Sequence, residues 1–214
     1  MSEAIMLQAN KLCKTYDDGT QALNNVSFDV ATGSIYAMLG GNGAGKTSAI
    51  SAIKAYLESH DIEVVVTREP GGTNIGEKVR ELLLDSENAA MTPECELLLF
   101  AAQRAQHVSE KILPALSSGC WVISDRFESA TIAFQEYGRG INPEIISAAS
   151  FVAVGDFKPD LNVILDIDPL VGLERVMSRG DEPDRMESGE LDFLTKARAG
   201  YVSQANSDPD RFSM

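Results

Sequence analysis

The stretch Gly40-Gly41-Asn42-Gly43-Ala44-Gly45-Lys46-Thr47 decides the fold of this chain. It matches the pattern G-x-x-x-x-G-K-[ST], with an apolar run before it at residues 35–39 and a segment of helical spacing after it. In such a loop the glycines let successive backbone N–H groups turn toward an oxyanion, and the following helix N-terminus adds partial positive charge. A glycine-rich turn that binds no ligand is the alternative interpretation. It is the weaker one, because a predicted strand and helix flank the loop. The stretch therefore predicts a nucleoside triphosphate site.

The residues of this loop have separate expected roles. Lys46 would reach the β- and γ-phosphates, and the Thr47 hydroxyl would bind Mg²⁺. The expected cofactors are thus Mg²⁺ and ATP, although the loop alone does not separate ATP from GTP. The residues expected to contact the nucleotide are Gly40, Asn42, Gly43, Ala44, Gly45, Lys46, Thr47 and Ser48.

Working outward from the loop, short apolar runs alternate with stretches of helical spacing. The runs lie at residues 35–39, 64–66, 121–123 and 163–165. Strands that are apolar at every position are buried on both faces, which is typical of a parallel sheet. Between them, steps of three and four place one apolar stripe on each helix, and the stripes are Ile75, Val79, Leu82 and Leu83, then Leu97, Ala101, Ala105, Val108, Ile112 and Leu116. The alternation predicts a right-handed, doubly wound α/β domain over residues 34–214.

Residues 1–33 have a different pattern. Two short strands are expected at residues 6–9 and 26–30, with a turn at Asp17-Asp18-Gly19 between them. The segment therefore predicts an antiparallel β ribbon ahead of the parallel sheet.

Composition limits the classes of protein that remain. Among 214 residues, 44% are hydrophobic and 23% are charged, and 18 Lys and Arg face 32 Asp and Glu for a net charge of −14. That charge argues against a sequence-independent nucleic-acid binder. No apolar run approaches 18 residues and the N-terminus lacks a signal-peptide pattern, so a membrane or secreted protein is not expected. Three cysteines without CxxC spacing, Cys13, Cys95 and Cys120, suit a reducing cytoplasm.

The N-terminal fifth of the chain resembles the start of an ABC-transporter ATPase. The segments that carry this resemblance are Leu7-Gln8-Ala9-Asn10-Lys11-Leu12-Cys13-Lys14-Thr15-Tyr16, Ala22-Leu23-Asn24-Asn25-Val26-Ser27-Phe28 and Gly33-Ser34-Ile35. The resemblance implies that Tyr16 stacks on adenine. It then stops, because no later segment resembles the LSGGQ signature or an apolar strand ending in Asp-Glu.

From about Lys46 to Phe212 the chain resembles the bacterial thymidylate kinases. The resembling blocks are Thr67-Arg68-Glu69-Pro70-Gly71-Gly72-Thr73, Glu96-Leu97-Leu98-Leu99-Phe100-Ala101-Ala102-Gln103-Arg104, Trp121-Val122-Ile123-Ser124-Asp125-Arg126-Phe127, Gly138-Arg139-Gly140 and Asp184-Arg185. This resemblance implies the three-layer fold of a P-loop nucleotide kinase. It also implies transfer of the γ-phosphoryl group of ATP to dTMP, a cytoplasmic location and a homodimer.

The resemblance assigns residues to the acceptor side of the site. Arg68 and Arg126 would bind the acceptor phosphate, and Asp125 would organise Mg²⁺ through water. Phe100 would stack on thymine, and Arg104 would hydrogen-bond its edge. The remaining positions implied to contact the acceptor are Glu69, Thr131 and Gln135.

The residues alone leave other interpretations open. Asp125 and Arg126 form a common pattern for an exposed salt bridge at a strand end. Phe100 has the helical spacing of a core residue, and Glu69 is also compatible with a plain loop carboxylate. Thr131 and Gln135 are also compatible with a solvated helix face.

A lid is expected near residues 179–189, where Gly180 and Pro183 interrupt a helical pattern. The resemblance places lid arginines on the transferring phosphoryl group. Arg185 is the favoured candidate for this role. Arg179 is the second candidate, and its alternative interpretation is a residue that only caps a helix end. His60 and His107 lack metal-ligand spacing and are expected at the surface.

Two departures from the kinase pattern complicate the prediction. Asn42 replaces a carboxylate that the family aims at the acceptor sugar. The family also continues beyond Phe212 with a last strand, an adenine-side loop and a helix, whereas this sequence ends at Met214. We expect a recombinant of two P-loop families, in which residues 1–33 partly replace that terminal piece. An ATP-binding module with little turnover and an ABC-type ATPase fragment are the alternative functions.

Overall fold

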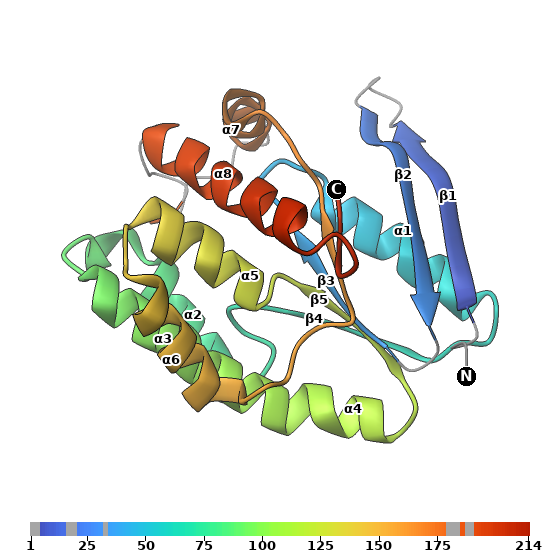
Figure 1. Cartoon of the computed structure of the whole chain (residues 1–214), viewed down its shortest axis with the longest axis horizontal. Coiled ribbons are helices and arrows are strands. Elements are labelled where there is room, and N and C mark those ends of the chain that lie inside the picture. The colour runs from blue at the N-terminus through green and yellow to red at the C-terminus, as the bar shows by residue number, and fades with distance from the viewer. Residues whose placement is uncertain (1–4, 16–20, 32–33, 179–184, 187–190) are drawn as a thin grey trace.

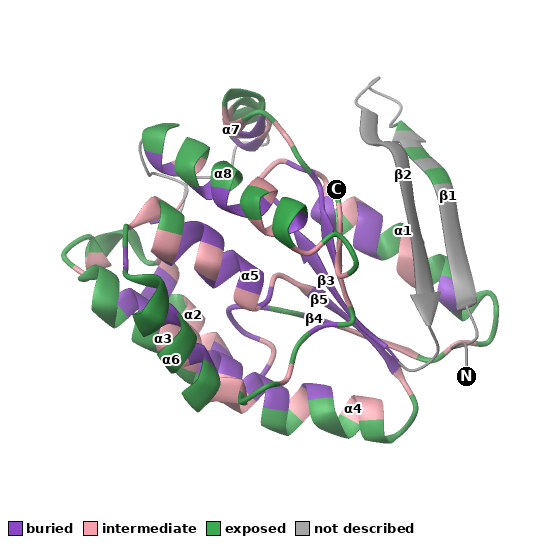
Figure 2. Cartoon of the chain, viewed as in Figure 1, coloured by how far each residue is buried: buried purple, intermediate pink, exposed green. Residues whose placement is uncertain are grey.

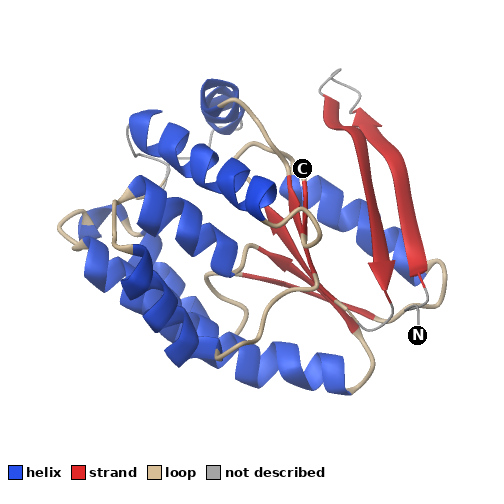
Figure 3. Cartoon of the chain, viewed as in Figure 1, coloured by secondary structure: helices blue, strands red, loops and turns tan. Residues whose placement is uncertain are grey.

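The structure is a computed structural model, and it describes residues 5–15, 21–31, 34–178, 185–186 and 191–214. The strands are β1 (Ile5–Thr15), β2 (Gln21–Ala31), β3 (Ile35–Leu39), β4 (Val64–Arg68), β5 (Trp121–Asp125), β6 (Leu161–Ile164) and β7 (Phe212–Ser213) (Figures 1 and 3). The α-helices are α1 (Lys46–Glu58), α2 (Asn74–Leu84), α3 (Pro93–His107), α4 (Leu113–Ser117), α5 (Glu128–Thr131), α6 (Pro143–Val154), α7 (Pro169–Ser178) and α8 (Leu191–Ser207). A 3₁₀ turn, η1 (Ser86–Asn88), and two π-helical segments, η2 (Val108–Ile112) and η3 (Ile132–Gly138), complete the set.

A five-stranded parallel sheet forms the centre of the molecule. Its strand order is β4-β5-β3-β6-β7, and every neighbouring pair runs parallel. The four apolar runs of the sequence form β3, β4, β5 and β6, so the predicted α/β fold with a parallel sheet is confirmed.

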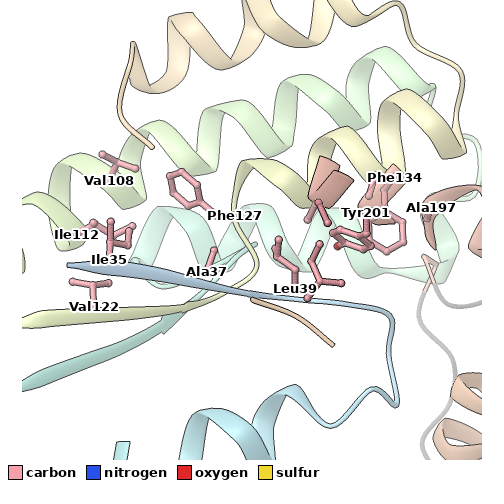
Figure 4. Packing of buried hydrophobic residues seen from close by; sticks show 14 of the residues in the cluster. Ile35, Ala37, Leu39, Val108, Ile112, Val122, Phe127, Phe134, Ala197 and Tyr201 are labelled. Atoms are coloured by element: carbon pink, nitrogen blue, oxygen red, sulfur yellow. The ribbon is translucent and has the colours of Figure 1, made fainter. Parts of the chain in front are cut away.

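The strands are buried on both faces because successive side chains point to opposite sides of a sheet. Ile35, Ala37 and Leu39 of β3 belong to one hydrophobic cluster, which also contains residues of η2, α5, η3 and α8 (Figure 4). Tyr36 and Met38 of the same strand belong to a second cluster, which contains residues of α1. Helices therefore cover both faces of the sheet, and the buried strands lie at the centre of three layers (Figure 2).

The helical stripes are confirmed to different degrees. The second stripe forms α3, η2 and α4 without a break, and Leu97, Val108 and Ile112 are buried. In α2 only Leu83 of the predicted stripe is fully buried, while Ile75 and Leu82 are 53% and 51% exposed. The predicted helical period is correct for α2, but only one edge of the apolar stripe reaches the core.

The ribbon predicted for residues 1–33 forms from β1 and β2, which pair antiparallel from Ile5 opposite Ala31 to Thr15 opposite Gln21. The predicted turn lies outside the described residues. The ribbon is a separate sheet that lies against α1 (Figure 1), and it does not extend the five-stranded sheet.

The expectation that the ribbon replaces a missing terminal strand is wrong. The strand beyond β6 is β7, whose residues Phe212 and Ser213 pair with Asn162 and Val163. The strand next to β6 is therefore formed by the C-terminal residues and not by the ribbon.

Within the described part of the chain, the helices fall short of the length and apolar character needed to cross a lipid bilayer. The three cysteines Cys13, Cys95 and Cys120 carry free thiols.

Candidate active site

One cavity of about 330 Å³ opens where β3, β4, β5 and β6 end. Ligands of open α/β sheets bind at this carboxyl edge. The cavity brings the glycine-rich loop together with the predicted acceptor residues. From the loop it is lined by Gly40, Asn42, Gly43, Gly45, Lys46 and Thr47. From the acceptor side it is lined by Arg68, Glu69, Phe100, Arg104, Asp125, Arg126, Thr131 and Gln135.

The glycine-rich loop depends on glycine at two positions. Gly40 has φ 132°, and a Cβ there would lie 2.5 Å from the Leu165 carbonyl oxygen. Gly43 has φ 77°, and a Cβ there would lie 2.5 Å from the carbonyl oxygen of Gly172 in α7. Both backbone conformations are in the region that favours glycine. The loop thus folds tightly between the end of β6 and α7.

The loop leads into the N-terminus of α1, where Gly45 is the N-cap residue and no side chain among the described residues caps the helix. The first N–H groups of a helix have no partner within it, so they are available to an anion. Lys46 Nζ donates to the carbonyl oxygens of Gly40 and Gly41 at 3.1 and 3.0 Å, which places the ammonium group over the loop. This arrangement can bind the phosphates of a nucleotide.

Two of the predicted nucleotide contacts do not line the cavity. Ala44 is 5% exposed and packs in the hydrophobic cluster under α1, and Ser48 is half-buried. Tyr16, the predicted adenine contact, lies outside the described residues.

Asp125 is the last residue of β5, Arg126 follows it, and both line the cavity. Arg126 has φ 70°, a conformation that is uncommon for a residue other than glycine. Hydrogen bonds hold it there, because Arg126 N–H donates to the Met38 carbonyl at 2.9 Å and Ser124 Oγ donates to the Arg126 carbonyl at 2.7 Å. Strained backbone of this kind is found at functional sites, where the surrounding structure maintains it.

The guanidinium of Arg126 faces the loop rather than Asp125. Its Nη2 donates to Asn42 Oδ1 at 2.6 Å, and its carbon lies 5.1 Å from the centre of the Phe134 ring. The structure therefore does not contain the strand-end salt bridge that the sequence left open. It also shows that the Asn42 amide, expected near the acceptor sugar, accepts a hydrogen bond from Arg126.

The site has oxygen atoms that suit Mg²⁺. Asp125 Oδ1 is buried and has no hydrogen-bond partner among the described residues, and Thr47 lies exposed at the cavity wall. Magnesium takes one or two protein oxygens and fills its other positions with water and phosphate oxygens. A buried, unpartnered carboxylate oxygen beside a phosphate loop fits this requirement.

A buried hydrogen-bond network holds Arg104 on the other side of the cavity. Its Nε donates to Glu69 Oε2 at 2.8 Å, and its Nη2 donates to Thr131 Oγ1 at 3.0 Å. Arg104, Glu69 and Thr131 are 2%, 3% and 2% exposed. Thr131 thus belongs to a buried network rather than to a solvated helix face.

Glu69 is part of a buried network rather than a plain loop carboxylate. One of its oxygens accepts from Arg104, and the other lies 3.0 Å from His107 Nδ1. Both carboxylate oxygens are therefore engaged inside the protein. Glu69 thus orients Arg104, and it also lines the cavity, so its predicted contact with the acceptor stays a prediction.

The prediction that His107 lies at the surface is wrong, whereas His60 is exposed as expected. His107 is 0% exposed, and its Nε2 lies 2.7 Å from Thr67 Oγ1. A neutral ring that donates from Nδ1 to Glu69 and accepts from Thr67 at Nε2 satisfies both contacts. His107 thus helps to orient Glu69, which in turn orients Arg104.

A second buried carboxylate, Glu96, stands behind Gln135. Gln135 Nε2 donates to Glu96 Oε1 at 2.9 Å, and both residues are 1% exposed. Burial alone would raise the pKa of Glu96. Hydrogen bonds from Arg139, Gln135 and Arg185, together with the charge of Arg139, outweigh burial and hold this pKa below its ordinary value. Glu96 is therefore ionised at neutral pH.

The structure corrects the expectation for Arg185. Arg185 is buried, its Nη2 lies 2.7 Å from Glu96 Oε2, and its Nε donates to the Leu83 carbonyl at 2.8 Å. It does not line the cavity around Lys46, because these partners on α2 and α3 hold it elsewhere. Arg179 and most of the predicted lid lie outside the described residues.

Phe100 and Arg68 lie where the acceptor was expected. Phe100 is half-buried at the cavity wall and belongs to none of the hydrophobic clusters of the described residues, which favours a ligand contact over a core role. Arg68 is exposed at the same wall and pairs with Glu77 at 2.9 Å. An exposed pair of this kind is weak, so the guanidinium remains accessible to a ligand.

The sequence did not indicate a role in the site for Glu96, His107 or Tyr201. Glu96 and His107 share a face of α3 with Phe100 and Arg104, and that helical spacing was a usable signal. Tyr201 of α8 lines the cavity, and burial raises the pKa of its hydroxyl. Its Oη has no hydrogen-bond partner among the described residues. Nothing local marks Tyr201, because the packing of α8 brings it to the site.

A glycine-rich phosphate loop at the carboxyl edge of a parallel sheet, facing arginines across one cavity, defines a P-loop nucleotide kinase. Comparison with known proteins narrows this class. The thymidylate kinase family profile matches residues 40–214. This chain belongs to the thymidylate kinase family.

Individual relatives agree with this assignment. The chain is 43% identical over 175 residues to a thymidylate kinase of Maridesulfovibrio salexigens, a match that spans 79% of this chain and 81% of the relative. It is 46% identical over 166 residues to one of Carboxydothermus hydrogenoformans, spanning 78% and 81% of the two chains. The crystal structure of a thymidylate kinase from Ehrlichia chaffeensis matches with a TM-score of 0.69 at 31% identity, covering 85% of this chain and 86% of that one.

The matched family region begins at Gly40. Residues 1–33 lie outside it, and none of these findings supports their origin in an ABC-transporter ATPase. That part of the interpretation stays a prediction.

Proposed function

We propose that this protein transfers the γ-phosphoryl group of ATP to dTMP and releases dTDP and ADP. One observation carries the proposal: a single cavity is lined by the phosphate loop and by the acceptor residues Phe100, Arg104 and Arg126. Two polyanions bound in this cavity would have their phosphates between Lys46 and Arg126. Membership in the thymidylate kinase family supports dTMP as the acceptor.

The residues of the site would act by positioning and by stabilising charge, which is how most phosphoryl-transfer enzymes work. The glycine-rich loop and Lys46 hold the phosphates of ATP. Arg126 and Arg68 neutralise the acceptor phosphate. Thr47 and Asp125 would hold Mg²⁺, which neutralises charge that develops on the phosphate oxygens.

The other side of the cavity would bind the base. The Phe100 ring offers a face for stacking, and Arg104 and Gln135 offer polar groups for the edge of the base. Their buried partners hold these groups in place before the substrate arrives, so little ordering is needed on binding.

A coupled assay of ADP release with dTMP, dUMP, AMP and shikimate tests the proposal. We expect turnover that is fastest with dTMP, and the absence of a dTMP preference would refute it. Calorimetric titration with ATP and then dTMP addresses the alternative of a nucleotide-binding module, because binding of both without dTDP formation would favour that module.

We also propose that two copies of the chain associate through α3 and α6. Large apolar side chains are exposed on these two packed helices, and they are Leu98, Ile145, Phe151 and Val152. Exposed large apolar side chains on neighbouring helices are typical of an interaction site. Analytical ultracentrifugation should give a dimer, and Val152→Glu, a change at a residue that is 87% exposed, should shift it toward monomer. The free thiols accord with a cytoplasmic location.

A further inference from the structure

The orientation of the Gln135 amide is determined by its partner. Gln135 Nε2 donates to Glu96 Oε1 at 2.9 Å. An ionised carboxylate can only accept hydrogen bonds, so the amide nitrogen must face Glu96 and the amide oxygen must face away from it. Gln135 lines the cavity, and its Oε1 accepts no hydrogen bond from the described residues. The cavity is therefore left with the acceptor of this amide rather than its donor.

Glu96 is itself held firmly. Arg139 donates to both of its oxygens, at 3.2 Å from Nε and 3.0 Å from Nη2, and Arg185 Nη2 lies 2.7 Å from Oε2. These contacts keep the carboxylate ionised and fix its plane, consistent with the lowered pKa of Glu96. A Gln135 amide turned the other way would place two oxygens against each other in a buried site.

Arg104 supplies the complementary group. Its Nε and Nη2 are engaged by Glu69 and Thr131, and its Nη1 makes no hydrogen bond to the described residues. The cavity wall near Phe100 thus offers a donor from Arg104 and an acceptor from Gln135.

This pair of groups matches only some pyrimidines. Thymine and uracil carry a carbonyl acceptor at position 4 next to an N–H donor at position 3. Cytosine carries an amino donor at position 4 next to an acceptor at position 3, which is the reverse order. A cytosine in the same place would set its N3 against Gln135 Oε1 and its amino group against the guanidinium.

We propose that Glu96 is a positioning residue that sets base specificity by holding the Gln135 amide with its oxygen toward the base, so that 4-oxo pyrimidines are accepted and 4-amino pyrimidines are rejected. Glu96 acts through Gln135 and does not touch the substrate. The inference rests on the proposed phosphorylation of dTMP and assigns one feature of its selectivity to one buried carboxylate.

The test compares Glu96→Gln with the unchanged enzyme on dTMP, dUMP and dCMP. A glutamine at position 96 can accept or donate a hydrogen bond. The Gln135 amide can therefore rotate so that either its oxygen or its nitrogen faces the cavity. We expect the ratio of kcat/KM for dTMP over dCMP to fall about tenfold, the size of one hydrogen bond. The change should be mainly in KM. The ratio for dTMP over dUMP should stay within about twofold, because these two bases share the edge that Gln135 meets.

Arg139→Gln is the matched control. It removes another partner of Glu96 and disturbs the same buried charges, but it leaves the Gln135 bond intact. We expect a lower melting temperature with the dTMP over dCMP ratio unchanged. If Arg139→Gln lowers that ratio as much as Glu96→Gln does, the effect is general loosening and the proposal is wrong.

A further variant protects the test against misfolding. Glu96→Asp keeps the charge that both arginines require but shortens the reach toward Gln135 by one methylene, and it should lower the dTMP over dCMP ratio by a smaller factor. If the folded position-96 variants keep the ratio of the unchanged enzyme, the proposal is overturned.

Failure of the proposed function can be recognised separately. If the unchanged protein does not phosphorylate dTMP, that function fails. The base preference is then measured by calorimetric binding of dTMP and dCMP, which requires no turnover. A dTMP preference in binding that Glu96→Gln abolishes would still support the role of Glu96, whereas a preference that persists in the variant would contradict it.

Discussion

The two ends of the cavity are built in different ways. The phosphate end comes from one contiguous run, residues 40–47, and its groups are mostly backbone N–H groups and glycines. The base end comes from side chains that are 27 to 39 residues apart in the chain, joined by buried hydrogen bonds. The first kind of site depends on local backbone conformation, and the second depends on how helices pack.

The charges at the two ends differ as well. At the base end, each arginine forms an ion pair with a buried carboxylate, since Glu69 pairs with Arg104 and Glu96 pairs with both Arg139 and Arg185. At the phosphate end, Arg126 forms no ion pair with a carboxylate of the described residues and donates instead to the neutral Asn42. An arginine without a carboxylate partner suits a phosphate, whereas an ion-paired arginine such as Arg104 contributes mainly through the direction of its hydrogen bonds, which suits an uncharged base.

The largest effect should follow from Lys46→Met, which removes charge at the phosphate end only. We expect kcat to fall about 10²- to 10³-fold, the usual loss when one group that stabilises transition-state charge is removed. Binding of dTMP should be nearly unchanged, because Lys46 Nζ is held at the glycine-rich loop by the carbonyl oxygens of Gly40 and Gly41. Steady-state kinetics and dTMP titration measure the two quantities. Equal loss of dTMP binding would show that the two ends are not separate.

The next largest effect concerns His107, which contacts both Glu69 and Thr67. Two substitutions, His107→Asn and His107→Gln, test these two contacts one at a time. His107→Asn can keep a donor near the Nδ1 position for Glu69, whereas His107→Gln extends toward Thr67 and leaves one Glu69 oxygen unpaired. A buried unpaired oxygen reduces stability by about 1–3 kcal/mol. We expect His107→Gln to unfold at lower denaturant concentration and to have the higher KM for dTMP. The prediction fails if the two variants behave alike.

A smaller effect should appear with pH. The pKa of Glu96 is lower in the folded protein than its ordinary value of 4.5, so its ion pairs contribute stability above that value. This contribution should be lost as the pH falls below about 4.5 through the lowered pKa. Denaturation at several pH values measures it, and Glu96→Gln should show a weaker pH dependence in this range. An unchanged pH dependence would contradict the assignment.

The smallest effect is expected for the exposed pair of Arg68 and Glu77. Glu77 has a lowered pKa because it accepts a hydrogen bond from the Gly72 N–H and from Arg68. Both side chains are more than two-fifths exposed, so solvent weakens the pair. Glu77→Gln should change the free energy of unfolding by no more than about 1 kcal/mol. Arg68→Gln should instead raise the KM for dTMP, and equal KM effects of the two changes would refute a phosphate contact for Arg68.

The same difference explains what the sequence could predict. Strands β3 to β6 and the phosphate loop follow from contiguous patterns, and the structure confirms the parallel sheet. The face of α3 that carries Phe100 and Arg104 also follows from helical spacing. The role of Glu69 does not, because its partners Arg104 and His107 lie 35 and 38 residues away.

Arg185 is a residue whose position was predicted incorrectly from the local sequence. In the sequence, Arg185 closely follows Gly180 and Pro183, which interrupt a helical pattern, and this position predicts a lid residue. Its buried position depends on Glu96 of α3 and the Leu83 carbonyl of α2, both far away in the chain. Similarly, Tyr201 reaches the cavity only because α8 packs against the face of β3 that carries Ile35 and Leu39. Contacts of this kind depend on tertiary packing, which no local pattern contains.

The most direct test of the whole account is to incubate the protein with ATP, Mg²⁺ and dTMP and to measure ADP and dTDP together. If the phosphate end and the base end serve one reaction, dTDP should form in a one-to-one ratio with ADP. Release of ADP without dTDP, or no reaction although both nucleotides bind, would contradict the account.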